Sequence, residues 1–562
     1  MVEAPITRIC KIIAFGVAAS ALAGGNAYAK RTVGAEGLKQ FVEARLAESV
    51  DRPAVAAAIY ADSLKQQPDN LLLASKTYVK AVEAGDFDLA VKAIRSLSLR
   101  GELDAEMPIL LFADAFARND MKAAANASVE MEALGNFAFL APLVDAWIAA
   151  DGGGNPLADL AVAEKNKTAS YYHLEQFILH GLARGSDDDV MALLEKVVEQ
   201  NEARMAPVRI IAAKHFLAKK DRERAIKLLE KKRTGPEARL LNSIMSGNTK
   251  NLAKKVDTDV GMGFLFQRLA SDLSTQRAFF LSLVSAHAAA RINPDSDYGH
   301  LVLGGSYADN ENGLSARSEY KKIAFGSAYA LQAISMEIAS YSRDEDYLGG
   351  QERLNELISQ DPTTPELKYL MGQLLQISGD HKAAATFFEQ AIELAEKMDF
   401  SDALLASYWL SLGSAQEQAG LWPAGLEALK KANALQPNSA SILNYLGYAQ
   451  LERRENTASA IAAIRKAHEM RSTSPAITDS LGWAYFITGE HEKAVGYLEL
   501  ARAGEPQDPT INEHLGDAYW TVGRKYEARY AWKSAKLFAD DEDMPRLASK
   551  IDMGLKPDLV SP

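Results

Sequence analysis

The 562-residue sequence contains a single cysteine, and this scarcity excludes an internal disulfide framework or a cysteine-rich zinc site. Glycine and proline are also modest, at 37 and 19 residues, which excludes a collagen-like or low-complexity chain. Basic residues are outnumbered, with 62 Lys and Arg against 74 Asp and Glu. The resulting net charge of -12 opposes a large surface for nucleic acid. A charged fraction of 24% and a hydrophobic fraction of 48% are ordinary for folded protein and argue against global disorder.

Motifs for catalysis are lacking as well. The sequence has no H-E-x-x-H, no G-x-S-x-G and no Walker loop. Ser318 and Lys321 form an S-x-x-K string, a match expected by chance in a long helical chain. His173 and His180 could share a helix face, but no third metal ligand is evident. We therefore expect no catalytic residue, no cofactor and no metal site, with an enzyme of unknown type as the remote alternative.

The beginning of the sequence, over positions 1–29, has the pattern of a secretory signal peptide. Arg8 and Lys11 precede a short apolar run over residues 12–25, and Ala27-Tyr28-Ala29 reads as the cleavage site. The apolar run is shorter than the roughly 20 residues that span a bilayer, although an uncleaved anchor is the alternative. Cys10 precedes the apolar run, so no lipidation cysteine follows it. We expect a non-lipidated periplasmic protein of a Gram-negative bacterium, or alternatively a secreted one, cleaved near Ala29.

The C-terminal third of the sequence repeats at a fixed period. The pair Leu481-Gly482 recurs 34 residues later as Leu515-Gly516. The Tyr, Gly and Ala residues that follow each pair keep the same distances from it. Similar pairs occur upstream at Leu303-Gly304, Met371-Gly372, Leu412-Gly413 and Leu446-Gly447. Apolar residues recur at helical spacing, so each unit predicts two antiparallel helices that cross closely at the glycine. One helix pair cannot bury its own apolar face, and neighbouring pairs must therefore stack in a linear array.

The N-terminal half keeps the same period with weaker markers. The alanines Ala56, Ala90 and Ala124 follow one another at this period, and Asp51, Gly85 and Asn119 hold the preceding turn position at the same interval. The register is lost between about residues 231 and 263, where we expect a break or an atypical repeat.

The markers L-G-x-x-Y, G, A and A…P at this period resemble the tetratricopeptide repeat. The resemblance is strong over roughly residues 363–538. Over residues 37–231 it depends only on the weaker recurrence of small and turn residues at the same interval. A helical array of another family is the alternative. It implies an all-α fold, a right-handed α-solenoid of antiparallel helix pairs with about eleven to thirteen repeats. The expected organisation is a signal peptide (1–29), degenerate repeats (30–230), an irregular junction (231–263), a C-terminal array (264–540), and a capping helix with a tail (541–562).

The same resemblance implies that the first helix of each pair lines a concave groove through its second, fifth, ninth, twelfth and thirteenth positions. Counting from Ala440, Pro475 and Pro509, the candidate partner-binding residues are Asn444, Tyr448, Leu451, Asp479, Trp483, Phe486, Asp517 and Trp520. Aromatic side chains with acidic neighbours suit a peptide segment with basic or apolar side chains. The alternative is that these aromatics pack against adjacent helices. Some domains of this family clamp a terminal carboxylate with Lys and Asn, but Asp479 and Trp483 stand at the clamp positions here.

The last repeats also resemble a narrower family. ITDSLGWAYF, and INEHLGDAYW followed by GRKYEARYAWKSA, are similar to repeats of a large proteobacterial envelope family. That family includes a lipoprotein adaptor of a periplasmic carboxyl-terminal processing protease, but the lipidation cysteine is missing here. We expect a non-catalytic scaffold or adaptor in the cell envelope that binds proteins or peptides, including a periplasmic protease or an envelope assembly complex, and no nucleic acid. The alternative is a subunit of an exopolysaccharide secretion, outer-membrane or pilus assembly machine.

Overall fold

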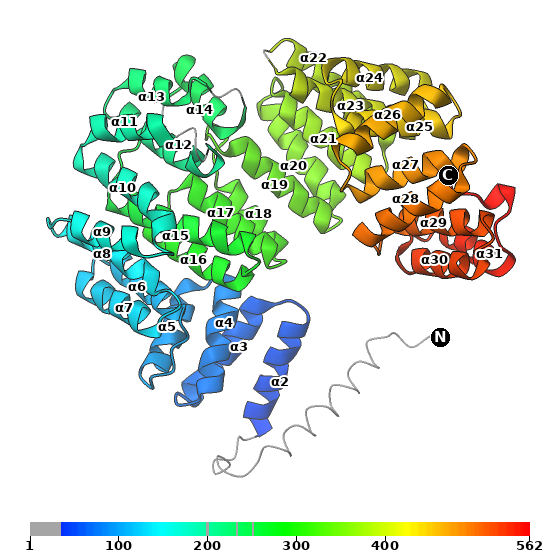
Figure 1. Ribbon diagram of the computed structural model, residues 1–562. Coiled ribbons are helices and arrows are strands. Elements are labelled where there is room, and N and C mark those ends of the chain that lie inside the picture. The colour runs from blue at the N-terminus through cyan, green and yellow to red at the C-terminus, as the bar shows by residue number, and fades with distance from the viewer. Residues whose placement is uncertain (1–34, 198–201, 232–233, 250–251, 399, 562) are drawn as a thin grey trace. The chain divides into compact units, whose positions relative to one another are not determined.

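The computed structural model describes residues 35–197, 202–231, 234–249, 252–398 and 400–561, and these residues form helices and turns without a strand (Figure 1). The predicted all-α class is thereby confirmed. The predicted signal peptide lies outside the described residues. The chain divides into two compact units, one ending at Ser340 and one beginning at Tyr341. None of the helices that the structure describes combines the length and the apolar character needed to cross a membrane.

Unit 1 is built largely from antiparallel helix pairs, including α4 with α5, α6 with α7, α15 with α16, and α17 with α18. Its helices are α2 (Ala35–Ser49), α3 (Pro53–Gln66), α4 (Leu71–Ala84), α5 (Phe87–Ser98), α6 (Met107–Ala117), α7 (Met121–Leu134), η1 (Ala138–Leu140), α8 (Ala141–Asp151), α9 (Leu157–Lys165), α10 (Ser170–Arg184), α11 (Asp187–Val197), α12 (Glu202–Ala218), α13 (Arg222–Leu229), α14 (Gly235–Met245), α15 (Thr258–Thr275), α16 (Phe279–Ile292), α17 (Asp297–Asp309) and α18 (Gly313–Lys321). Helix α19 (Ala330–Arg343) crosses the division between the units.

The weak repeat interval of the N-terminal half corresponds to real structure. The three turn residues adopt the left-handed backbone conformation, with φ of 51° at Asp51, 76° at Gly85 and 58° at Asn119. The three alanines that follow, Ala56, Ala90 and Ala124, are fully buried. A left-handed residue ends one helix and reverses the chain, and a small buried residue then lets the next helix approach closely. These sequence predictions are confirmed.

Unit 1 departs from linear stacking at α15 and α16. These two helices pack back against α4, α6, α8 and α10, far upstream in the chain. The His287 imidazole lies 3.1 Å from the Val82 carbonyl oxygen, 205 residues away in sequence, and the Arg291 guanidinium pairs with Asp114 at 3.1 Å. The Gly261 backbone lies against the Trp147 ring. A linear array contacts only its neighbours, so unit 1 adds these distant contacts to the predicted tandem packing of its helix pairs.

The segment that loses the repeat register contains α14 and an extended stretch, residues 252–257, that runs along the end of α12. The Lys254 backbone N–H donates to the Lys214 carbonyl oxygen (3.1 Å), and the Val256 N–H donates to His215 Nδ1 (3.0 Å). The predicted domain boundaries follow repeat register rather than spatial packing, and they stay predictions.

Unit 2 contains five consecutive antiparallel pairs, from α21–α22 to α29–α30, followed by α31. Its helices are α20 (Tyr347–Gln360), α21 (Pro365–Ile377), α22 (His381–Glu396), α23 (Asp402–Gln418), α24 (Trp422–Leu435), α25 (Ala440–Glu452), α26 (Thr457–Met470), α27 (Pro475–Ile487), α28 (His491–Gly504), α29 (Pro509–Thr521), α30 (Lys525–Phe538), α31 (Met544–Met553) and η2 (Pro557–Leu559).

The glycine at the eighth position of each first helix in unit 2 lies at the crossing with its second helix. A Cβ atom at Gly482 would lie 2.8 Å from Leu498 Cγ, and one at Gly372 would lie 2.6 Å from the Phe388 ring. Such distances are shorter than ordinary packing contacts, so only glycine allows the helices to approach this closely. The predicted helix crossing is confirmed, and it fixes which face of each first helix points away from its partner.

Candidate functional site

The first helices of unit 2 (α21, α23, α25, α27 and α29) contact one another through a recurrent pair of positions. The fifth residue of one repeat meets the sixth residue of the next. The pairs are the hydroxyls of Tyr369 and Ser411 (2.9 Å), the amide of Asn444 donating to Ser480 (3.2 Å), and Asp479 with the His514 imidazole (3.0 Å). The second, fifth, ninth, twelfth and thirteenth positions of these helices therefore form a continuous row, which we call the first-helix face.

A hydrogen-bonded ladder connects α21, α23 and α25 across this face. The Gln376 amide donates to Ser414 (3.0 Å), and the Tyr445 hydroxyl donates to Ser414 (2.9 Å) and to Glu417 (3.3 Å). Arg453 completes the ladder with an ion pair to Glu417. Because each polar group is held by the neighbouring repeat, the ladder orients the Glu417 carboxylate while leaving part of it in contact with solvent.

The charged residues of the first-helix face are all acidic. Its carboxylates are Glu366, Glu417, Glu452, Asp479, Glu513 and Asp517, and the five positions of these five repeats include no Lys or Arg. The Glu452 side chain is solvent-accessible, yet partial burial and the nearby Glu417 charge raise the pKa of its carboxyl, against a hydrogen bond from Tyr448 that lowers it. The raised pKa indicates that the face would gain from a cation at this point.

The predicted aromatic residues of α27 are buried. Trp483 is 1% exposed; its ring stacks on Phe486 (centroids 4.6 Å apart, 8° between planes) and on His514 (4.0 Å, 10°). Leu451 is buried as well, whereas Asn444 and Tyr448 are half-buried. The structure thus brings the predicted residues of α25 and α27 together in one row, but Trp483 and Phe486 fill the spaces between helices. Their role in partner binding stays a prediction.

The chain's own C-terminal helix covers the last part of the face. The Lys550 ammonium is fully buried and pairs with Glu513 (2.6 Å) and Asp517 (2.8 Å). Arg546, one turn earlier on α31, donates two hydrogen bonds to the Glu513 carboxylate, each 2.8 Å. Two carboxylates of the face are therefore occupied by two cations at helical i, i+4 spacing.

The tail that follows α31 adds backbone contacts to the same place. The Ser561 N–H donates to Asp517 (2.9 Å), and Gly554, whose φ is 85°, lies directly against the Trp520 ring. A side chain at Gly554 would overlap this ring, so close approach and the left-handed backbone conformation both require glycine. Asp517 becomes fully buried and Trp520 half-buried beneath this segment.

Electrostatics at this end follow from the buried pairs. Burial acts to lower the pKa of His514, but the Asp479 carboxylate outweighs burial and raises that pKa. Burial acts to raise the pKa of Glu513, but Arg546 and Lys550 outweigh it and lower that pKa. These two shifts favour the charged forms of His514 and Glu513, whereas burial raises the pKa of Asp517 despite the opposing effect of Lys550.

Sequence reasoning missed the polar ladder and the basic residues that occupy the face. The ladder involves sixth-position residues, such as Tyr445, which the position rule does not include. The basic pair was visible in MPRLASKIDM, where Arg546 and Lys550 are one helical turn apart, and Glu513 stands at a fifth position. Combining these two signals could have predicted the contact.

Two other residues named in the sequence analysis, His180 and Lys321, contact neighbouring protein side chains. His180 is buried and stacks on Trp147 with ring centroids 3.6 Å apart, and burial lowers the pKa of its imidazole to about 4. The Lys321 ammonium lies 3.7 Å from the Glu337 carboxylate. Within the described ranges, no cluster of three or more His, Cys, Asp or Glu side chains is arranged to hold a metal ion.

Comparison with known proteins identifies the repeat type of unit 2. Residues 360–536 match the family model described as tetratricopeptide repeat. The TPR repeat-containing protein PA4667 of Pseudomonas aeruginosa is 37% identical over 84 residues, which cover 15% of this chain and 14% of that protein. The chain thus matches only a small part of this relative's length.

Two solved structures with similar helical arrangements cover very different shares of this chain. TTC0263, a thermophilic TPR protein of Thermus thermophilus, is 25% identical to this chain, with a TM-score of 0.29. The match covers 33% of this chain and 97% of the TTC0263 chain. Yeast Tom70 is 12% identical with a TM-score of 0.36, covering 92% of this chain and 95% of its own.

Proposed function

We propose that this chain, whose residues 360–536 match the tetratricopeptide repeat, is a non-catalytic scaffold that binds a protein segment on its first-helix face. The segment would carry basic and apolar side chains and would lie along α21, α23, α25 and α27. Proteins of this repeat type generally bind protein or peptide partners through stacked helix pairs.

The observation that carries this proposal is the chain's own C-terminal helix. Arg546 and Lys550 bind carboxylates of α29 with distances of 2.6–2.8 Å, which shows the chemistry that the face accepts. The same acidic row continues upstream at Glu417, which pairs with Arg453 and stays partly exposed, and at Glu452, which is exposed. A basic partner segment there would repeat the contacts that α31 makes at the end.

The rest of the face suits such a segment. Ile377, at a thirteenth position, is 61% exposed and offers an apolar contact, and Gln418 and Ser441 are exposed polar neighbours. In unit 1, by contrast, α15 and α16 occupy the surface that α4, α6, α8 and α10 would otherwise present. The accessible acidic face of α21–α25 is therefore the better site for a partner.

A binding titration tests this proposal. A labelled peptide with alternating Lys and Leu should bind the full chain, and Glu417→Gln combined with Glu452→Gln should weaken the affinity about fivefold or more, because two partly exposed charge pairs are lost. Binding should also weaken as salt rises. Glu427→Gln is the matched control, since Glu427 lies on the second helix α24 and pairs only locally with Lys430 (2.8 Å). Equal binding of an acidic peptide, or an unchanged double variant, would contradict the proposal.

We also place this scaffold in the cell envelope, as a non-lipidated periplasmic adaptor whose partner is a periplasmic protease or an envelope assembly complex. The signal-peptide pattern of residues 1–29 supports export, and the last repeats support the narrower resemblance. Mass measurement of the purified protein should give a chain that begins at Lys30, recovered from the periplasmic fraction. Cross-linked pull-down from that fraction would identify the partner, and recovery of the uncleaved chain from the cytoplasm would rule this placement out.

A further inference from the structure

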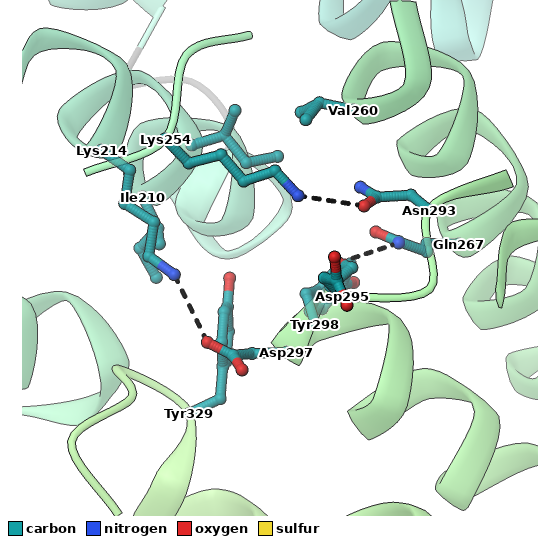
Figure 2. Close-up of a pocket in the computed structure, with 12 residues that line it drawn as sticks. Ile210, Lys214, Lys254, Val260, Gln267, Asn293, Asp295, Asp297, Tyr298 and Tyr329 are labelled. Atoms are coloured by element: carbon teal, nitrogen blue, oxygen red, sulfur yellow. Dashed lines mark hydrogen bonds and ion pairs between the residues drawn. The ribbon is translucent and has the colours of Figure 1, made fainter. Parts of the chain in front are cut away.

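The break in the repeat register encloses a cavity in unit 1. It lies between α12, the extended stretch 252–257, α15, the turn after α16, and the start of α17, and its volume is about 70 Å³ (Figure 2). A water molecule needs roughly 10–15 Å³ by this measure, so the space accommodates several waters or a small organic group. Lys254 and Val260 of the irregular segment form part of its wall.

One side chain in the wall of this cavity has an unmet hydrogen bond. The Tyr329 ring is 4% exposed and packs on Tyr298 (centroids 5.4 Å apart). Its hydroxyl is buried and has no hydrogen-bond partner among the described residues, and Figure 2 shows it pointing into the cavity. Burial raises the pKa of Tyr329 well above its usual value, so the hydroxyl keeps its proton and can donate it to an acceptor in the cavity.

A cation faces the same space. Lys254 comes from the extended stretch, and its ammonium donates to the Asn293 amide oxygen at 3.2 Å. Among the described residues no carboxylate forms an ion pair with Lys254, whereas the second lysine of the wall, Lys214, is neutralised by Asp297 at 3.4 Å. Lys254 and Asp295 are both exposed to water at the edge of the cavity. Lys254 therefore offers a cation at the mouth of the cavity that a carboxylate ligand can reach.

The remaining wall is apolar. Ile210 and Ile211 of α12 and Val260 of α15 line the cavity beside the polar groups. An apolar wall with a few convergent polar groups is the usual composition of a small-molecule site.

We propose that this cavity binds a carboxylate that carries a short apolar chain. The Lys254 ammonium and the Tyr329 hydroxyl hold the carboxylate oxygens, and the isoleucines and the valine contact the hydrocarbon. A charged acceptor satisfies the buried hydroxyl more strongly than a neutral one does. The carboxylate can come from a free organic acid or from the C-terminus of a peptide, since both present the same group.

Calorimetric titration of the full chain tests the site. Propionate should bind saturably, and propionamide, which has the same shape without the charge, should bind at least about fivefold more weakly. Tyr329→Phe and Lys254→Gln should each weaken propionate binding by a similar factor. Lys255→Gln is the matched control, because this neighbouring lysine does not line the cavity. Tyr329→Phe without ligand should unfold at the same temperature as the parent or higher, because no protein hydrogen bond is lost.

A second pair of probes identifies the source of the carboxylate. An N-acetylated Gly-Ala dipeptide with a free C-terminus is compared with its amide. The site is supported if propionate or the free-acid dipeptide binds and if the binding depends on Tyr329 and Lys254. Which of the two acids binds then shows whether the carboxylate comes from a free organic acid or from a peptide C-terminus. Absence of saturable binding for all probes, equal binding of acids and amides, or indifference to both substitutions would overturn it and leave a cavity that holds only water.

Discussion

Asp517 is a fully buried carboxylate, and at residue scale it is the point on which the end of the repeat array converges. The Lys550 ammonium (2.8 Å), the Trp532 indole N–H (2.8 Å) and the Ser561 backbone N–H (2.9 Å) all reach it. Asp517 stands at the ninth position of its repeat, which the sequence pattern predicts to bind a partner. In the structure this carboxylate holds the chain's own C-terminal segment. A buried charge must be paired, so the basic residue of this contact becomes structurally essential.

Replacing this basic residue should destabilise the end of the array. Lys550→Met keeps the length of the side chain but leaves Glu513 and Asp517 without their buried cation, and breaking a buried pair in this way costs about 3–5 kcal/mol. Hydrogen exchange should show lost protection in α29–α31. Lys556→Met, at an exposed lysine of the tail, should change little. Unchanged protection in the Lys550 variant would contradict the pairing.

Stability should also depend on pH through His514. Asp479 raises the pKa of this buried imidazole in the folded protein above the unfolded value of about 6.5. The charged pair therefore contributes stability that is fully present below about pH 6.5 and is lost as pH rises through the folded pKa. Urea unfolding at pH 6 and pH 8 should show this decline in the parent and a smaller decline in Asp479→Asn. Identical pH dependence in the two proteins would disprove the assignment.

At the scale of elements, the helix pair is defined by the crossing at its eighth-position glycine. Pro475–Ile487 and His491–Gly504 meet where Gly482 lies against Leu498. The glycine weakens its own helix slightly, yet it allows α27 and α28 to approach closely. Because Trp483 is the next residue along the same helix, this crossing fixes the direction in which the first-helix face points.

Overpacking this crossing should be costly. Gly482→Leu forces a side chain into a space where even a Cβ atom would lie 2.8 Å from Leu498, and we expect a loss of about 1–3 kcal/mol in the free energy of unfolding. The matched control is Gly496→Leu on α28, where nothing lies within 4 Å and a better helix former should stabilise by up to about 1 kcal/mol. Thermal unfolding that moves in the same direction for both variants would contradict the assigned crossing.

At the scale of the whole molecule, the sequence predicted what is local and missed what is distant. The repeat period predicted the helix pairs of unit 2, the turns at Asp51, Gly85 and Asn119, and the glycine crossings, because each marker reflects a contact within one repeat. The position rule left two alternatives for Trp483, the groove or packing against adjacent helices, and in the structure His514 and Phe486 stack on its ring. The contact between His287 and Val82 joins residues 205 apart and leaves no periodic signal.

That distant packing makes unit 1 a cooperative body rather than a chain of independent repeats, and one substitution tests this. A methyl group in Gly261→Ala of α15 would overlap the Trp147 ring of α8, whose indole N–H donates to Gln176 at 2.7 Å. We expect a loss of about 1–3 kcal/mol, with hydrogen exchange rising together in α8, α10 and α15. Gly326→Ala, in the same unit with nothing within 4 Å, is the control. In a linear array the effect would stay within α15 and its chain neighbours, so protection retained in α8 and α10 would show that the two regions are not coupled.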